Sequence, residues 1–371
     1  MKKKKNYFYG IDFLRWFAAF GVVSYHYVVC FQITEIKNNS FLNYLVLNKE
    51  YAPNFVWLFW SISGFVFTNI YILRNITFKN FFVARFARLY PLHFLTLIIV
   101  GIIQIISLAL FNHTQLNSDI DVYHFLLHLF FVSDWGFQNN WSFNVPVWSV
   151  SIEFPIYFLF FITLFYLKKS RFLFPIIMMI FFYYILTFVI NSFQEKNIIS
   201  LNQFQDLAFF NFMTCIFYFF MGSFIYSFFI KTKKFNKLGM IISFFVIIYC
   251  IYYLNTEDKN AIFHINFFPS TVVLFFSLIL FFAYFDDLFN KFFKKNLSLG
   301  NTSYSIYLIH YPILLVMLII TENYFLDIKI FNNFMVFLGF VIILQIFSLI
   351  SFTYFETPLR KIINKKYGYL Y

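Results

Sequence analysis

The sequence predicts an all-α, polytopic integral membrane protein with about ten transmembrane helices and both termini in the cytoplasm. Of its 371 residues, 61% are hydrophobic and only 12% are charged, whereas a soluble domain carries roughly 25% charged residues. Apolar runs recur from the first residues almost to the last, and basic residues gather in short clusters between alternate runs. No stretch is left for a separate soluble domain, so residues 1–371 are predicted to form a single transmembrane domain.

Ten apolar segments are candidate membrane spans, since about 20 residues of helix cross roughly 30 Å of hydrocarbon. The first is expected to remain a helix and not to be removed as a signal peptide, because Asp12 and Arg15 interrupt its start. A further apolar piece, 125–132, is too short to cross and is interpreted as a re-entrant or interfacial segment or as part of an outer loop. The ten spans are 11–31, 52–73, 90–111, 148–168, 172–191, 208–230, 238–254, 267–285, 301–320 and 331–354.

The basic residues alternate between the two sides of the predicted bundle. With residues 2–5 placed inside, 22 of the 28 Lys and Arg residues fall in the N-terminus and the inner segments, and five fall in outer loops. Because excess Lys and Arg mark cytoplasmic segments, the net charge of +12 is interpreted as a topology signal, and no nucleic-acid partner is expected. The three cysteines lack CxxC spacing, so neither a disulfide framework nor a metal site is predicted.

Two ionisable residues of the first span, Arg15 and His26, are candidate functional residues, because such groups are costly inside a bilayer. Their separation by eleven residues places them within roughly 20° on one helix face and about 16 Å apart in depth. Arg15 then lies near the cytoplasmic end and His26 in the outer half. Two plainer interpretations stay open: a hydrogen-bonded packing histidine, and an arginine anchor that extends to the headgroups.

Glu153 is expected at a depth similar to that of His26. It follows Trp148 at the outer start of the fourth span. A carboxylate beside an imidazole holds its tautomer and stabilises its protonated form, which prepares a histidine as a general base. The depth match therefore predicts that Glu153 orients His26, with a structural Glu bonded to a neighbouring hydroxyl as the alternative.

Arg85 and Arg88 stand three residues apart at the expected start of the third span, just before Pro91. On one helical face at the cytoplasmic surface, their planar guanidinium groups suit phosphate oxygens. Positive-inside topology explains the same arginines, so both interpretations stay open. A proline near a helix start fits this placement.

Two further stretches carry small or polar residues within spans, at 59–65 and 303–312. Ser61, Ser63 and Gly64 allow close approach of a helix or a ligand. His310 is expected near the midplane, where it needs a partner or a water-filled cavity, and Tyr304 supplies a hydroxyl on the same helix. Each of these residues can equally serve packing between helices.

Six features in this order resemble the membrane-bound acyltransferase 3 family of acyl-CoA-dependent O-acyltransferases, over nearly the whole chain. By this resemblance, Arg15 and His26 match the family's paired Arg and His, Arg85 and Arg88 match its cytoplasmic Arg pair, and Glu153 matches the acid of its Trp-Ser motif. The six are Asp12-Phe13-Leu14-Arg15 followed by His26, the 59–65 stretch, Arg85 to Pro91, Trp148 to Glu153, Ser303 to Pro312, and Phe355-Glu356-Thr357-Pro358.

The resemblance implies an enzyme of the bacterial cytoplasmic (inner) membrane. It would take an acyl group, usually acetyl, from cytoplasmic acyl-CoA and deliver it to a hydroxyl of an extracytoplasmic carbohydrate, such as O-antigen lipopolysaccharide, exopolysaccharide or a lipid-linked glycan. Some family members carry an extra soluble domain after the membrane part. This chain ends soon after the tenth span, so the membrane domain, alone or with a separate partner, is expected to complete the reaction without a metal.

His26 and Glu153 are thus the predicted catalytic residues, and Arg15, Arg85 and Arg88 the predicted acyl-CoA contacts. Either His26 deprotonates the acceptor hydroxyl for direct attack, or His26 is itself transiently acylated. Two rival functions stay open: a transporter or flippase of an anionic or lipid-linked substrate, and a structural or regulatory membrane subunit. Four more residues are candidate contacts to the substrate or the developing oxyanion, namely Ser63, Trp148, Tyr304 and His310.

Overall fold

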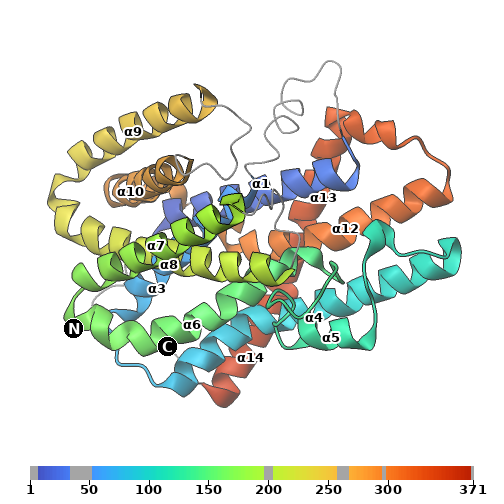
Figure 1. Cartoon of the computed structure of the whole chain (residues 1–371), viewed down its shortest axis with the longest axis horizontal. Helices are drawn as coiled ribbons and strands as arrows, with labels where there is room; N and C mark the ends of the chain where they lie inside the picture. The colour runs from blue at the N-terminus through green and yellow to red at the C-terminus, as the bar shows by residue number, and fades with distance from the viewer. Residues whose placement is uncertain (1–6, 34–51, 196–203, 257–266, 295–297, 369–371) are drawn as a thin grey trace.

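The computed structural model describes residues 7–33, 52–195, 204–256, 267–294 and 298–368. In these ranges the chain is helical, with a single β-bridge between Asp119 and Ser142 and no strand (Figure 1). The long helices are α1 (Tyr9–Cys30), α3 (Ala52–Tyr71), α4 (Phe78–Phe111), α6 (Trp148–Lys169), α7 (Leu173–Glu195), α8 (Phe204–Thr232), α9 (Asn236–Thr256), α10 (Phe267–Lys294), α12 (Ser303–Asn323) and α13 (Phe334–Ile350).

Shorter helical elements connect or extend these long helices. Two short α-helices are α5 (Val122–Leu129) and α11 (Ser298–Asn301), and α14 (Thr357–Tyr367) ends the described chain. A π-helical segment, η6 (Ser351–Glu356), joins α13 to α14. The 3₁₀ turns are η2 (Gln115–Asn117), η3 (Val145–Val147), η4 (Lys233–Phe235) and η5 (Ile328–Asn332).

The predicted all-helical membrane class is confirmed. Each of the ten predicted spans overlaps one long helix of the described ranges. Seven helical stretches among the described residues are long and apolar enough to cross a membrane, one of which covers both α8 and α9. The number of ten crossings and the cytoplasmic position of the termini stay predictions.

The predicted start of the third span at residue 90 is wrong. α4 begins at Phe78, where the side chain of Thr77 caps the helix by accepting a hydrogen bond from the Asn80 N–H (3.3 Å). Arg85 and Arg88 therefore lie inside this helix, and Pro91 lies in its interior and not at its start. A span that begins only after the charged residues is too short, because a helix can carry charged side chains where it faces a polar cavity.

The last predicted span also ends too early, at residue 354. The helical run continues through η6 and α14 to Tyr367. Glu356 is held inside this run because its Oε1 accepts hydrogen bonds from the hydroxyls of Ser305 (2.5 Å) and Ser351 (3.0 Å). The short piece predicted at 125–132 forms α5, an eight-residue helix.

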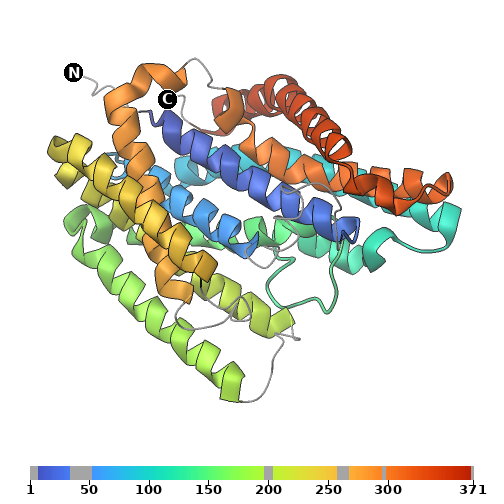
Figure 2. The same cartoon turned by 90° about the horizontal axis from the view of Figure 1, so that it is seen from above.

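Two glycines allow α3 and α8 to cross at backbone contact. A Cβ atom on Gly64 would lie 1.8 Å from the carbonyl oxygen of Phe219, and one on Gly222 would lie 1.9 Å from that of Ser61. Ser61 and Gly64 thus serve helix packing, the plainer of their two interpretations. On the other side of α3, helix α1 packs against α3, α10 and α12, so it lies near the centre of the bundle (Figure 2).

The two ends of the bundle are formed by different segments of the chain (Figure 2). At the end here called the basic end, α1 begins, α14 ends, and α6 connects to α7 and α8 to α9. At the opposite end, here called the loop end, residues 112–147 join α4 to α6 and carry η2, α5 and η3. The basic end holds most of the described Lys and Arg residues, among them Arg74, Lys79, Lys168, Lys169, Arg171, Lys231, Lys233, Lys234, Lys237, Arg360, Lys361, Lys365 and Lys366.

Candidate active site

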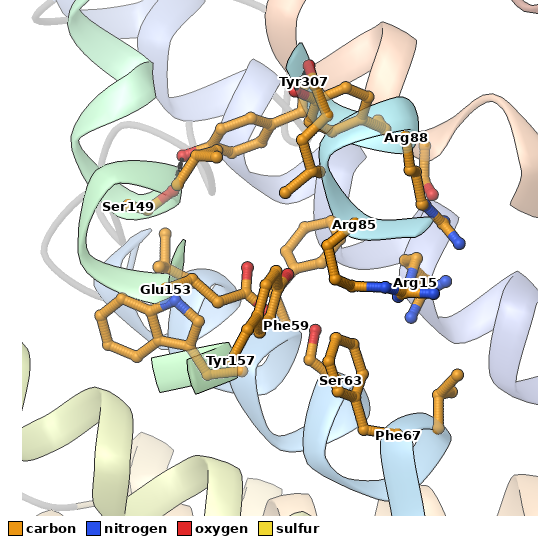
Figure 3. A pocket seen from close by; sticks show the side chains of 17 residues that line it. Arg15, Phe59, Ser63, Phe67, Arg85, Arg88, Ser149, Glu153, Tyr157 and Tyr307 are labelled. Atoms are coloured by element: carbon orange, nitrogen blue, oxygen red, sulfur yellow. Dashed lines mark hydrogen bonds between the residues drawn. The ribbon is translucent and has the colours of Figure 1, made fainter. Parts of the chain in front are cut away.

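A cavity opens between α1, α3, α4, α6 and α12 (Figure 3). It offers about 80 Å³ to the centres of water molecules, room for several waters, since one needs roughly 10–15 Å³. Seven of its polar lining residues come from all five helices: Arg15, Ser63, Arg85, Arg88, Glu153, Tyr157 and Tyr304. The cavity therefore brings together all three predicted acyl-CoA contacts and one of the two predicted catalytic residues.

The three arginines make this cavity positive. Arg15 lies 3.7 Å from the carboxylate of Asp12, one helical turn earlier. The Arg85 guanidinium stacks over the ring of Phe67 at 4.7 Å, and its Nε is buried without a partner. Buried guanidinium groups with open N–H donors are suited to an anion with several oxygens, such as a phosphate.

Glu153 is the carboxylate that faces these arginines inside the cavity (Figure 3). The hydroxyls of Ser63 and Tyr157 are its hydrogen-bond partners, and Arg15 and Arg88 are the cationic groups that act on it. Its Oε1 is buried without a partner. This is the bonding to neighbouring hydroxyls that the sequence left open as the alternative role.

His26 is paired with His310, and not with Glu153 as predicted. The Nδ1 atom of His26 lies 3.0 Å from the Nε2 atom of His310, and the two rings stack at 5.0 Å. The predicted pairing failed because equal depth does not place two helices side by side. α12 packs directly against α1, whereas α6 places Glu153 beside Ser63 of α3.

The hydrogen bonds indicate where the two histidine rings carry their protons. The Nδ1 of His310 lies 3.2 Å from the carbonyl oxygen of Ile306, and since a carbonyl only accepts, this Nδ1 carries the proton. The Nε2 of His310 is then an acceptor, so the Nδ1 of His26 donates to it. In the neutral form of His26, its Nε2 then holds a lone pair, the form that a general base requires.

Tyr307 connects the cavity to this histidine pair. Its ring lines the cavity and lies 6.0 Å from the ring of His310, one turn further along α12. Its hydroxyl donates to the carbonyl of Pro146 (2.8 Å) and bonds Ser149 (2.6 Å). The arginines and the histidine pair are thus two parts of one site, the arginines toward the basic end and the histidines toward the loop end.

The structure separates the four remaining candidates. Ser63 and Tyr304 line the cavity, and the Tyr304 hydroxyl donates to the Leu89 carbonyl at 2.7 Å. His310 contacts the predicted base directly. The Trp148 ring packs edge to face on Trp60 at 6.0 Å, which is a packing role.

Sequence reasoning missed Ser149 and Tyr157, which both line the cavity. The signal that finds them is helical period, because they stand four residues before and four residues after Glu153 on one face of α6. Among the residues that the structure describes, no cluster of His, Cys, Asp or Glu is arranged to hold a metal ion.

A family model described as the acyltransferase domain matches residues 8–353. The chain belongs to the acyltransferase 3 family. This confirms the resemblance carried by the six ordered motifs. No solved structure matches this family member significantly.

Curated relatives of this family member include proteins named O-acetyltransferase OatA from Staphylococcus aureus strains NCTC 8325 / PS 47, COL and MRSA252. Each is 25% identical over 408 aligned residues. The alignment covers 98% of this chain but 59% of each relative, so the chain spans well under two thirds of their length.

Proposed function

We propose that this protein is a membrane O-acetyltransferase that passes an acetyl group from acyl-CoA at the basic end to a carbohydrate hydroxyl at the loop end. The observation that carries the proposal is the two-part site: an arginine-lined cavity and, beyond its lining residue Tyr307, the hydrogen-bonded pair of His310 and His26. Membership of the acyltransferase family and relatives named O-acetyltransferase support the reaction class.

Acyl-CoA is the donor that fits the arginine part of the site. Its phosphates need multidentate cationic donors, which Arg15, Arg85 and Arg88 supply on one cavity wall. Its pantetheine arm is long and mostly uncharged, so it suits the stretch between the arginines and Tyr307. The bilayer is the setting, because four of the five helices that line the cavity, α1, α4, α6 and α12, are apolar and long enough to span it.

Acyl transfer at this site is a balanced exchange of one C–S bond for one C–O bond. The acceptor oxygen attacks the thioester carbonyl carbon while the lone pair of His26 Nε2 takes the hydroxyl proton. The tetrahedral intermediate expels the CoA thiolate, and the proton from His26 completes free CoA. A variant in which His26 Nε2 first carries the acyl group balances equally and uses the same tautomer.

His310 acts in this mechanism as the group that orients His26. Once His26 takes a proton, both ring nitrogens are donors, and the His310 Nε2 acceptor stabilises that cation. Glu153 acts in the arginine part, where it holds Ser63 and Tyr157 and offsets part of the positive charge. A surface polysaccharide or lipid-linked glycan of a bacterial cytoplasmic membrane is the acceptor class that the family resemblance implies.

The test is acetyl transfer in proteoliposomes that contain purified protein, radiolabelled acetyl-CoA and a panel of bacterial surface polysaccharides. We expect label in the glycan and one free CoA per acetyl moved, both lost in His26→Ala. A matched control is His93→Ala, which removes another buried histidine with a single carbonyl partner outside this site. Glycan movement without CoA release would favour the transporter, and equal transfer by His26→Ala would overturn the assigned base.

A further inference from the structure

Besides Pro91 in α4, two interior prolines lie in helices of the site, Pro155 in α6 and Pro312 in α12. Pro155 and Pro312 each stand two residues after a site residue, Glu153 and His310 respectively. A proline has no N–H, so the carbonyl four residues before it loses its helical hydrogen bond. The freed carbonyls are those of Ser151 and Leu308, and both residues are fully buried. In a membrane interior such a carbonyl needs another donor, since water does not supply one.

The loop end supplies a side-chain donor to each freed carbonyl. The indole N–H of Trp135 donates to the Ser151 carbonyl at 3.1 Å, and the side-chain amide of Asn144 donates to the Leu308 carbonyl at 3.2 Å. Both donors lie in the segment between α5 and α6, within ten residues of each other. Asn144 is fully buried, and the Nδ2 assignment is the one that avoids placing two acceptors face to face.

The four residues from each freed carbonyl to its proline form a stretch without the usual helical hydrogen bond, here called a proline gap. A site residue lies in each of the two gaps. Glu153 stands midway between Ser151 and Pro155, and His310 stands midway between Leu308 and Pro312. The direction of each helix at these residues therefore depends on whether the freed carbonyl stays bonded. If the freed carbonyl has no donor, it tilts away from the helix axis, and the helix bends further at the proline.

We propose that Asn144 and Trp135 are positioning residues, which fix the two proline gaps and thereby hold His310 against His26 and Glu153 in the arginine cavity. Further bonds tie the same segment to the two helices. The Ser151 hydroxyl donates to the Phe131 carbonyl (2.9 Å), and the Tyr307 hydroxyl donates to the Pro146 carbonyl (2.8 Å). The segment at the loop end thus sets the geometry of both parts of the site.

This inference rests on the proposed acetyl transfer for its kinetic readout, and matched proline substitutions test it. Asn144→Ala is expected to lower kcat about tenfold, the size of effect from leaving a buried carbonyl unpaired, with the KM for acetyl-CoA unchanged. Adding Pro312→Ala restores an N–H four residues after Leu308, so Asn144→Ala/Pro312→Ala is expected to recover most of the loss. The mismatched pair Asn144→Ala/Pro155→Ala is expected to recover none.

A second pair of variants distinguishes a loss of positioning from a general loss of folding. Trp135→Phe keeps an aromatic ring beside Phe212 and replaces the indole, with its N–H, by a smaller ring that has no donor, so it is expected to lower kcat severalfold. Pro155→Ala is expected to rescue it, and Pro312→Ala is not. Rescue by the mismatched proline as well, or by neither, would overturn the inference.

Thermal midpoints of the same variants separate this inference from the proposed function. If the wild type shows no acetyl transfer, the proposed function fails, yet matched rescue of the midpoint would still support the positioning role. If transfer occurs but Asn144→Ala and Trp135→Phe keep the kcat and midpoint of the wild type, the positioning role is wrong and the proposed function stands.

Discussion

The two parts of the site solve the same problem, polar groups inside an apolar bundle, in different ways. Toward the basic end, the guanidinium groups of Arg15, Arg85 and Arg88 share with Glu153 a cavity that has room for several waters. Toward the loop end, the rings of His26 and His310 bond one another, and His310 also bonds a backbone carbonyl. The arginines thus lie where water or an anionic substrate can solvate their charge. The two histidines are instead stabilised by hydrogen bonds to one another and to the backbone.

The two parts of the site are also expected to act in different steps: the arginines in donor binding and the histidines in acyl transfer. The arginines are built to hold a charged substrate in place, so losing one should weaken donor binding and leave the chemical step largely intact. The histidines are built to present one lone pair, so losing one should slow the chemical step with little effect on donor binding.

The largest effect is expected for His26→Ala. General-base catalysis contributes roughly 10²–10⁴-fold in rate, so kcat should fall by that factor while the KM for acetyl-CoA stays within about twofold. Steady-state kinetics of CoA release measure both constants. A rise in KM with little change in kcat would move His26 from the chemistry to donor binding and so break the division.

A smaller effect is expected for His310→Phe, which keeps a ring of similar shape and removes the acceptor for the His26 proton. Loss of this bond to a buried partner costs about 1–3 kcal/mol, so kcat should fall about tenfold to a hundredfold. The double variant His26→Ala/His310→Phe should be no slower than His26→Ala, because His310 acts only through His26. Additive losses would mean that His310 contacts the substrate itself.

The smallest effect concerns a buried carboxyl in the loop-end segment, which lies between the candidate membrane-spanning helices. Burial raises the pKa of Asp134 to about 7, although a hydrogen bond from Asn211 (3.1 Å) opposes this shift. Because the folded carboxyl binds its proton more tightly than the unfolded one, its contribution to stability is complete below about pH 4 and is lost as the pH rises through about 7.

Asp134→Asn should therefore raise the thermal midpoint at pH 8 by a few degrees and leave it unchanged at pH 4. Burial also lowers the pKa of His128 to about 3, which destabilises the fold as the pH falls below about 6.5. Comparing variant with wild type at each pH cancels that titration. Equal midpoints at every pH would show that Asp134 is ionised at no cost.

The sequence predicted most of the helices and most of the site residues. Apolar run length placed the helices well because lipid and neighbouring helices impose the same constraint on each span. It failed at α4 and at the last helix, where charged or polar residues inside a helix face a cavity or a serine pair. A run-length criterion cuts a helix at such residues, although the backbone continues through them.

The sequence did not predict which of the candidate site residues contact one another. His26 and His310 were both singled out, but 284 residues separate them, and depth along a span says nothing about which helices are neighbours. Depth and chemistry instead suggested Glu153 as the partner of His26. The sequence also could not predict the role of Asn144, because that role depends on the contact between its side-chain amide and the freed carbonyl of Leu308.

The central claim, that the arginines bind the donor's phosphates while the histidines perform the transfer, is tested most directly by shortening the donor. We would compare kcat/KM for acetyl-CoA and for S-acetylpantetheine, which lacks the phosphates, in the wild type, Arg88→Gln and His26→Ala. The account predicts that Arg88→Gln lowers kcat/KM about tenfold or more for acetyl-CoA only, and that His26→Ala lowers it equally for both donors. Equal losses for both donors in Arg88→Gln would contradict the account.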